Sequence, residues 1–468
     1  MGMRVREIDE SDVGRVIEIF RAVYSDDFPF QQFYDARWVK KGVFSDDIIW
    51  LVAEDESGTV VGSASVLLGS GDADDLIGEF GRLVVDPDAQ TRGAGTALTE
   101  GLVEHARPWI EWGFAECRTV HPGAQKILSR LGFGSVGFEP FAYTLGERRE
   151  SMALVARLFG NATRLRRNNP RVIPEVYPIA WQALRNTGLE GDVVSDRAPG
   201  YPWDDELVVE ELPALEIRPL LRLGRSQAWD REIYGGVRVE HGYLKLTKAS
   251  ARYLVARRDR VPVGAIGYVY DPIDDKVRVT ELIATDDRAR GTLVRALLQH
   301  VTDQHSPVYI HVDVSAYAPD MQATLQQMGF FAAGYCPAMV FEGVERLDIV
   351  RMVKLGASWN PGPMQLLDAP GEMMQLVEKA FAEANRGCTV ADIARGVGLL
   401  EGLGDREIAQ VRSICSERDY ERDETVFSAG EPSRQLYVVI DGGVRVVAED
   451  GCTELAEVPR GQVFGEMA

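Results

Sequence analysis

The chain has 468 residues, of which 45% are hydrophobic and 26% charged, enough apolar material for several folded cores. This composition excludes a wholly disordered or collagen-like chain. Its 51 basic and 72 acidic residues give a net charge of −21, and so acidic a surface repels phosphate backbones and anionic lipid. We therefore expect no membrane partner and no nucleic-acid partner.

The 5 cysteines lie far apart and form no CxxC or Cys/His cluster, so neither a disulfide framework nor a metal site is expected. The N-terminus lacks the apolar core of a signal peptide, and no apolar run approaches the ~18 residues that a membrane span requires. These features together favour a cytoplasmic protein.

In chain order, the apolar periods of residues 1–158 alternate between those of strands and helices. A strand is expected over 5–8, followed by an amphipathic helix that Ser11 caps. Further strands are expected over 48–53, 60–68, 80–85, 117–120 and 135–145, and further helices over 93–106 and 123–131. This order predicts a mixed α+β sheet.

Several landmarks of this first segment return later in the same order and at near-equal spacing. They are Val61-Gly62, Gly93, Gly132-Phe133 and Gly137-Phe138, matched by Val263-Gly264, Gly291, Gly329-Phe330 and Gly334-Tyr335. We interpret them as two copies of one domain in tandem, over residues 1–158 and 215–356.

Residues 159–214 are the expected connector, in which Pro, Asn and Gly recur. The connector also carries Arg164, Arg166, Arg167 and Arg171. An ordered connector with solvated arginines is the simpler interpretation. The alternative is a phosphate-binding or RNA-contacting arm, which the net charge of −21 disfavours.

Beyond the second copy, residues 357–398 are expected to form a helical linker, with helices near 370–384 and 389–400. Residues 399–468 then change in character, because short apolar segments alternate with tight glycine turns. Strands are expected over 426–427, 436–440, 444–448 and 453–458. This pattern predicts part of an antiparallel β-roll.

The loop from Gln90 to Thr96 stands between a predicted strand and a predicted helix. Its glycines allow a bulky anion to approach the backbone, and the helix start offers unpaired N–H groups and the positive end of a dipole. With the strand order above, this loop resembles the acetyl-CoA-binding motif of the GNAT acyltransferase superfamily, Q/R-x-x-G-x-G/A. The resemblance covers the whole first copy and implies acetyl-CoA as co-substrate.

The resemblance also assigns residues to the two parts of the cofactor. Those implied at the pyrophosphate are Gln90, Arg92, Gly93, Ala94, Gly95 and Thr96. Those implied along the pantetheine arm are Leu83, Val84 and Val85, on a strand that splays away from its neighbour.

Acyl transfer to an amine requires a base, because an alkyl ammonium has a pKa near ~10.4. Glu79 stands where some family members carry a general-base glutamate; its alternative is an ordinary solvated edge glutamate. Many members also place a tyrosine before the Gly-Phe as acid to the thiolate, but this chain has Leu128 there. Either another group, such as Tyr143 or His121, protonates the thiolate, or none is needed.

The second copy departs further from the motif. Its loop keeps Arg288 and Gly291 but has Leu293 where the family has Gly or Ala, and a leucine would crowd a phosphate. Glu281 is the acid nearest to the position of Glu79. We expect a degenerate GNAT-like copy that shapes the acceptor cleft, with cofactor binding as the alternative.

Residues 399–468 resemble the start of a cyclic-nucleotide-binding domain. In that family, the motif that begins here with Phe464 and Gly465 opens the phosphate-binding cassette, and its glutamate, here Glu466, binds the ribose hydroxyl. The family's phosphate-binding arginine would follow Ala468. We therefore expect a cyclic nucleotide to bind only in a longer chain.

The sequence thus predicts an acetyl-CoA-dependent N-acyltransferase, regulated by a C-terminal cyclic-nucleotide sensor, acting on a small-molecule or protein amine. The alternative is a non-catalytic CoA-binding or signalling scaffold, which the missing tyrosine and the degenerate second loop favour. The identity of the acceptor and the oligomeric state stay open.

Overall fold

The computed structural model describes the chain in segments, and the statements below concern these residues. They are 3–25, 28, 31–72, 74–89, 93–146, 148–212, 231–235, 251–357, 359, 362–396, 418, 420–428, 435–439, 442–448, 454–459 and 462–465. The chain divides into two compact units, Met1–Ala380 and Phe381–Ala468.

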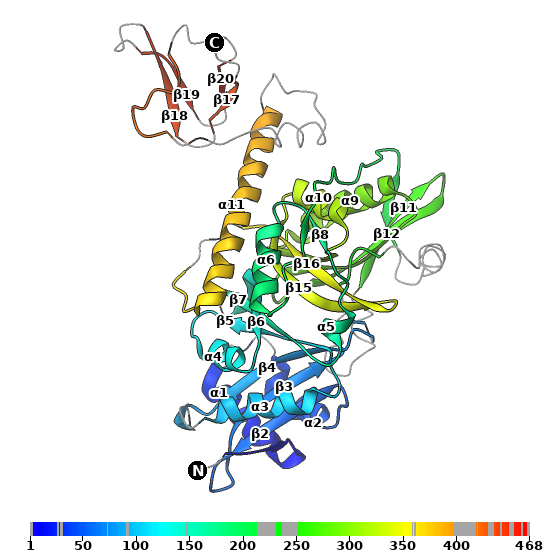
Figure 1. Cartoon of the computed structure of the whole chain (residues 1–468), viewed down its shortest axis with the longest axis vertical. Helices are drawn as coiled ribbons and strands as arrows, with labels where there is room; N and C mark the ends of the chain where they lie inside the picture. The colour runs from blue at the N-terminus through cyan, green and yellow to red at the C-terminus, as the bar shows by residue number, and fades with distance from the viewer. Residues whose placement is uncertain are drawn as a thin grey trace. The chain divides into compact units, whose positions relative to one another are not determined.

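A 14-stranded mixed sheet forms the framework of the first unit (Figure 1). One half runs β1 (Arg4–Glu7), β2 (Ile48–Glu54), β3 (Val60–Leu68), β4 (Ile77–Val85), β5 (Trp112–Arg118), β7 (Arg148–Leu158), β6 (Gly134–Leu145). The other, counted from the opposite edge, runs β10 (Val208–Glu211), β11 (Arg252–Arg258), β12 (Val261–Asp271), β13 (Lys276–Ala284), β14 (Tyr309–Ser315), β16 (Glu345–Leu355), β15 (Phe331–Glu342). Strand order from each edge inwards is therefore the same.

The halves join where β6 pairs with β15, at Gly137 opposite Gly334. A Cβ at Gly137 would lie 2.7 Å from the carbonyl oxygen of Ala333, so the backbones approach too closely for a side chain. These are the glycines that recur after each Gly-Phe in the sequence. The repeated glycine thus has a physical reason, which is the close contact between the two halves.

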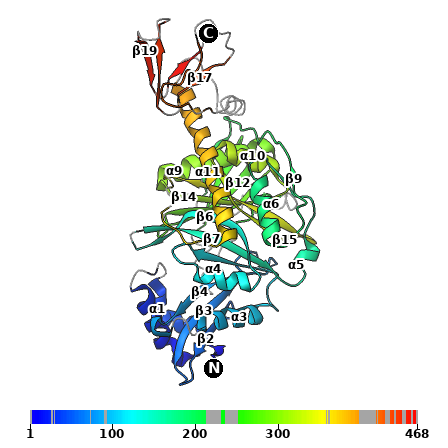
Figure 2. The same ribbon diagram turned by 60° about the vertical axis from the view of Figure 1, so that its left-hand side comes forward.

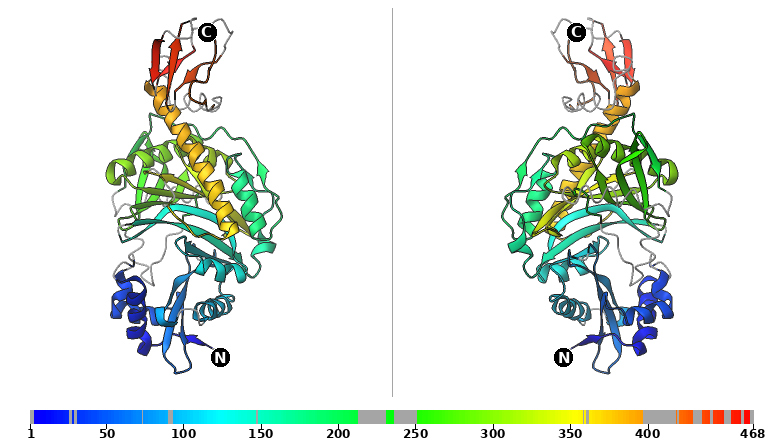
Figure 3. Two further views of the ribbon diagram at one scale, coloured as in Figure 1. Left: turned by 90° about the vertical axis from the view of Figure 1, so that its left-hand side faces the viewer. Right: turned by 90° about the vertical axis from the view of Figure 1, so that its right-hand side faces the viewer.

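Helices cover both faces of the first half. The core under α3 (Ala94–Ala106) and α4 (Gly123–Arg130) includes Phe80 and Phe133. A separate core under α1 (Val13–Tyr24) and α2 (Ala36–Val43) is rich in aromatic rings. Figures 2 and 3 show α1 and α3 on opposite sides of the strands, so different helices cover the two faces of the first half.

The connector packs on both halves, and Nδ2 of Asn186 donates to the carbonyl oxygen of Ser135 on β6. It contains α5 (Ala162–Leu165), β8 (Arg171–Val172), α6 (Tyr177–Asn186) and β9 (Val194–Ser195). Arg166 is buried between Asp348, at 2.6 Å, and Asp192, at 2.9 Å. The expectation of solvated arginines is therefore wrong for Arg166, which fastens the connector to β16.

Several predicted elements differ from those observed. Strand β5 spans Trp112–Arg118 rather than 117–120, and β7 and α2 were not predicted. Residues of β5 and β7 are buried on both faces, so they lack the alternation that marks a half-exposed strand. A short 3₁₀ turn, Glu10–Asp12, precedes α1, and Asp9 rather than Ser11 caps it.

The first unit also contains α9 (Asp287–His305) and α10 (Pro319–Gln327). A single helix, α11 (Asp368–Gly396), replaces the two expected near 370–384 and 389–400. Within the described residues, no helix combines the length and the apolar character that a membrane span requires.

The second unit contains short antiparallel strands, as predicted. Strand β17 (Tyr437–Val438) pairs with β20 (Val463–Phe464), and β18 (Gly443–Val447) pairs with β19 (Glu454–Pro459). Phe464 stacks with Tyr437 and Phe427. Gly465 follows with a φ of +97°. Glu466 lies outside the described residues, as does the segment 397–417.

Candidate active site

Strands β4 and β5 are parallel and separate into a fork. Their pairing covers only Ile77 to Glu79 on β4, opposite Trp112 to Phe114 on β5, although both strands continue. A bulge against β3 accompanies the separation, with Arg82 at a φ of +55°. The part of β4 beyond Glu79 therefore has no ladder partner on its β5 side.

Two of the three residues predicted along the pantetheine arm face the start of α3. A Cβ placed at Gly95 would lie 3.7 Å from both Leu83 and Val85. The side chain of Val84 is buried instead in the core under α1. The structure thus brings Leu83 and Val85 together with the predicted loop and turns Val84 away from it.

Gly93 precedes α3 in a left-handed conformation, with a φ of +87° and no atom within 4 Å of an added Cβ. The amides of Ala94, Gly95 and Thr96 follow it in the first helical turn, where N–H groups have no intrahelical acceptor. A positive helix dipole end and these N–H groups suit a pyrophosphate. Gln90 and Arg92 lie outside the described residues.

Glu79 occupies the last paired position of β4, at the base of the fork. Glu79 is only 7% exposed, and Nη2 of Arg82 donates to its Oε1 at 2.6 Å. The alternative of a solvated edge glutamate is therefore wrong. The bulge explains the ion pair, since it turns Arg82 back toward a residue on the same strand.

Tyr143 contacts side chains from both halves of the sheet. Its hydroxyl donates to Glu116 on β5, and Nζ of Lys276 lies 5.0 Å from the centre of its ring. Lys276 opens β13, so a residue of the second half reaches a predicted catalytic residue of the first. No local signal in the sequence indicated this contact.

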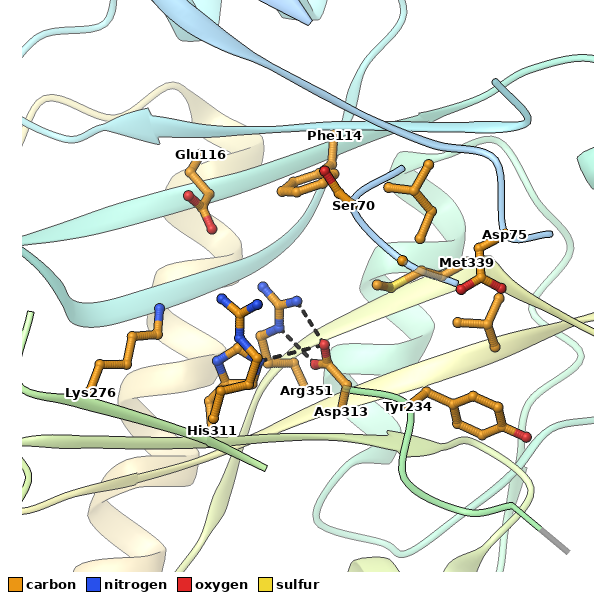
Figure 4. Close-up of a pocket in the computed structure, with 14 residues that line it drawn as sticks. Ser70, Asp75, Phe114, Glu116, Tyr234, Lys276, His311, Asp313, Met339 and Arg351 are labelled. Atoms are coloured by element: carbon orange, nitrogen blue, oxygen red, sulfur yellow. Dashed lines mark hydrogen bonds and ion pairs between the residues drawn. The ribbon is translucent and has the colours of Figure 1, made fainter. Parts of the chain in front are cut away.

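Both halves line a pocket next to the fork (Figure 4). Its volume is about 40 Å³, room for a few waters or a small polar group and not for acetyl-CoA. The lining includes Phe114, the ladder partner of Glu79, and paired residues on neighbouring strands point to the same face. The pocket and Glu79 therefore lie on one face of the sheet.

Charged side chains inside this pocket are mostly compensated. Arg351 donates to Asp313 at 2.8 and 3.0 Å and to Glu139 at 2.9 Å. Burial alone would raise the pKa of Asp313, but Arg351 holds it well below its usual value. Burial lowers the pKa of His311 to about 3, so this imidazole is neutral at pH 7. Burial also lowers the pKa of Lys276.

The second half differs from the first at the corresponding loop. Helix α9 begins at Asp287, capped by Asp286, so Gly291 lies inside the helix and does not open it as predicted. A Cβ at Gly291 would lie 2.3 Å from the carbonyl oxygen of Pro202 in the connector. Acidic residues and the connector thus occupy the place where a phosphate would sit.

The ladder also corrects the expected position of the second acid. Lys276 opposite Tyr309 corresponds to Ile77 opposite Trp112, so Arg278 stands at the position of Glu79. Glu281 lies further along β13 and accepts a hydrogen bond from Tyr253.

Two family models match parts of this chain. Residues 46–134 match the family model of the acetyltransferase (GNAT) domain, and residues 417–468 match that of the cyclic nucleotide-binding domain. Glutaminase 1 of Bradyrhizobium diazoefficiens is 39% identical over 70 residues, which are 15% of this chain and only 11% of the glutaminase.

Solved structures similar to this chain include a phosphinothricin acetyltransferase from Sinorhizobium meliloti in complex with acetyl-CoA, 21% identical, with a TM-score of 0.30. That match covers 34% of this chain and 90% of the other. Ribosomal-protein-alanine N-acetyltransferase from Brucella melitensis is 20% identical over 33% of this chain and 99% of its own, with a TM-score of 0.31. The chain contains a GNAT acetyltransferase domain at residues 46–134 and a cyclic nucleotide-binding domain at residues 417–468.

Proposed function

We propose that the protein transfers the acetyl group of acetyl-CoA to an amine, on a small molecule or a protein. The observation that carries the proposal is the fork between β4 and β5, with Glu79 at its base and the Gly93-led helix beside it. Backbone groups of β4 beyond the fork can align an extended pantetheine arm, and the α3 amides can hold the pyrophosphate.

In the proposed reaction, Glu79 accepts a proton from the ammonium of the acceptor, and the neutral nitrogen attacks the thioester carbonyl carbon. The new C–N bond forms, the C–S bond breaks, the attacking nitrogen loses a second proton, and the CoA thiolate takes up a proton. Tyr143 is the proposed donor, and the proton that the nitrogen releases restores its hydroxyl, which Glu116 orients by accepting from it in the resting protein. Arg82 holds the Glu79 carboxylate in place throughout.

The second half is proposed to be a degenerate copy of the same domain that shapes the acceptor side without binding CoA. Its acidic helix cap and the connector over Gly291 support this assignment. Arg278 at the position of Glu79 supports it further, because an arginine cannot act as a general base at neutral pH.

Acetyl-CoA binding is expected to depend on Gly93. Gly93→Glu places a carboxylate where the pyrophosphate would bind, so we expect affinity to fall roughly 30-fold, about 2 kcal/mol, in a calorimetric titration. Gly58→Glu is the matched control, because Gly58 has a similar φ of +79° and equally open surroundings in the β2–β3 turn.

The control should bind acetyl-CoA as the parent protein does. If Gly93→Glu binds acetyl-CoA as tightly as Gly58→Glu and the parent protein do, the pyrophosphate binds elsewhere. Binding at two sites would instead show that the second half takes the cofactor despite its acidic cap.

We propose further that a cyclic nucleotide bound by the C-terminal domain changes the rate of acetyl transfer. The family match at residues 417–468 supports this part. Addition of cyclic AMP should change kcat/KM about 5-fold or more, a typical allosteric coupling. An unchanged rate with cyclic AMP and cyclic GMP would remove this domain as regulator.

A further inference from the structure

Lys276 is a buried cation at the boundary between the halves. The residue is 7% exposed, and its ammonium group lies 5.0 Å from the ring centre of Tyr143 and 4.7 Å from that of Tyr309. Among the described residues, no carboxylate forms an ion pair with Nζ. Glu139 and Glu116 favour its charged form from beyond ion-pair distance, but burial outweighs them and lowers the pKa of Lys276, so an anion in direct contact with Nζ would stabilise the charge.

His311, in the same pocket, has the same lack of partners. The residue is 3% exposed, and within the described segments neither ring nitrogen has a hydrogen-bond partner. Its Nε2 lies 3.6 Å from Oδ2 of Asp313, beyond hydrogen-bond distance. Figure 4 shows His311 and Lys276 on the same side of the pocket, and Asp75 on the other.

The acidic groups of the pocket, in contrast, already have donors. Asp313 is held by Arg351, and Glu116 accepts from Tyr143. Asp75 accepts from the backbone N–H groups of Phe341 and Asp72. Among the described lining residues, the Lys276 ammonium and the His311 imidazole, whose N–H can donate, therefore have room for a further partner, and together they suit a small anion.

We propose that this pocket binds a carboxylate, with Lys276 as its counter-ion and His311 as a hydrogen-bond donor, and that the carboxylate belongs to the acceptor. The acceptor is then a small amine that carries a carboxylate. The assignment of the carboxylate to the acceptor rests on the proposed function, because it assumes that the amine is acetylated at Glu79. Phe114 connects the two positions, since it lines the pocket and pairs with Glu79. A polyamine would instead be repelled by Lys276.

The binding test uses propionate as a carboxylate without an amine, with propionamide as its uncharged match, titrated by calorimetry without acetyl-CoA. Propionate should bind at least 10-fold more tightly than propionamide. Lys276→Met should weaken propionate binding at least 10-fold, while Lys276→Arg, which retains the charge, should bind within about 3-fold of the parent. Lys354→Met is the control, because Lys354 bonds to the Met328 carbonyl and lies outside the pocket lining.

Thermal unfolding of each variant shows whether it is folded, and if the methionine variant is not, the comparison of propionate with propionamide on the parent protein decides the test. Equal binding of propionate and propionamide, or of the parent and Lys276→Met, would overturn the pocket assignment.

The acceptor test compares β-alanine with β-alaninamide by CoA release, and β-alanine should have the higher kcat/KM by at least 10-fold. Propionate binding without acetylation of β-alanine would overturn the acceptor assignment and indicate a free acid as ligand. If no amine at all releases CoA, the proposed function fails while the carboxylate site stands.

Discussion

Glu79→Gln should lower the turnover of any amine acceptor at least ~100-fold, the usual size of a lost general base. Glutamine has the same shape, and its side-chain oxygen can still accept the hydrogen bond from Arg82 that now reaches Glu79 at 2.6 Å. It cannot take up a proton from the ammonium, so kcat should fall while acetyl-CoA affinity is retained. CoA release with a panel of amines measures the rate, and calorimetry measures the affinity.

Glu281→Gln is the matched control for this experiment. Glu281 lies on β13 of the second half and is bonded to Tyr253, so its loss should change turnover less than about 3-fold. Unchanged turnover in Glu79→Gln would remove Glu79 from the role of base. If the parent protein binds acetyl-CoA yet releases no CoA with any amine, the scaffold interpretation replaces the enzyme.

Arg351→Met should destabilise the first unit by about 3 to 5 kcal/mol, the range for breaking a buried ion pair from one side. Arg351 compensates Asp313 on β14 and Glu139 on β6, so its loss removes the arginine that is bonded to both buried carboxylates. The shift of the urea midpoint of unfolding measures the effect. Arg257→Met, which breaks the more exposed pair with Glu210, should cost less than about 1 kcal/mol.

The cost of Arg351→Met should also depend on pH. The pKa of Asp313 in the folded protein lies below its unfolded value, so its ion pair stabilises the fold at neutral pH. This stabilisation is lost as the pH falls below about 4, toward the folded pKa. The difference between parent and variant should therefore narrow in acid, and a difference that is constant with pH would contradict the ion-pair explanation.

The sequence predicted those parts of the site that depend on local chain geometry. Gly93 and the helix behind it follow from the freedom of glycine and from the apolar period of residues 94–106. The repeat of Gly137 and Gly334 is visible in the sequence, but only the sheet shows that the two glycines pair with each other. Strands β5 and β7 were misjudged, because burial on both faces removes the alternation that predicts a strand.

The pocket could not be predicted in the same way. Lys276 lies beside Tyr143, and shares a pocket with His311 and Glu116, only because the sheet brings β13 and β14 to the first half, and no local pattern encodes such contacts. A lysine at the start of a strand is normally expected to be exposed to solvent. The ion pair between Glu79 and Arg82 was likewise hidden, since it depends on a bulge in β4.

The junction at Gly137 has a consequence for how such a chain could have arisen. If β6 of one ancestral subunit paired with β6 of a second through the same glycine, the contact would be isologous, with each edge strand protecting the other. Gene duplication and fusion would convert that dimer into one polypeptide. The two formerly identical halves would then be free to diverge, so that the first retains Glu79 while the second places Lys276 beside the pocket.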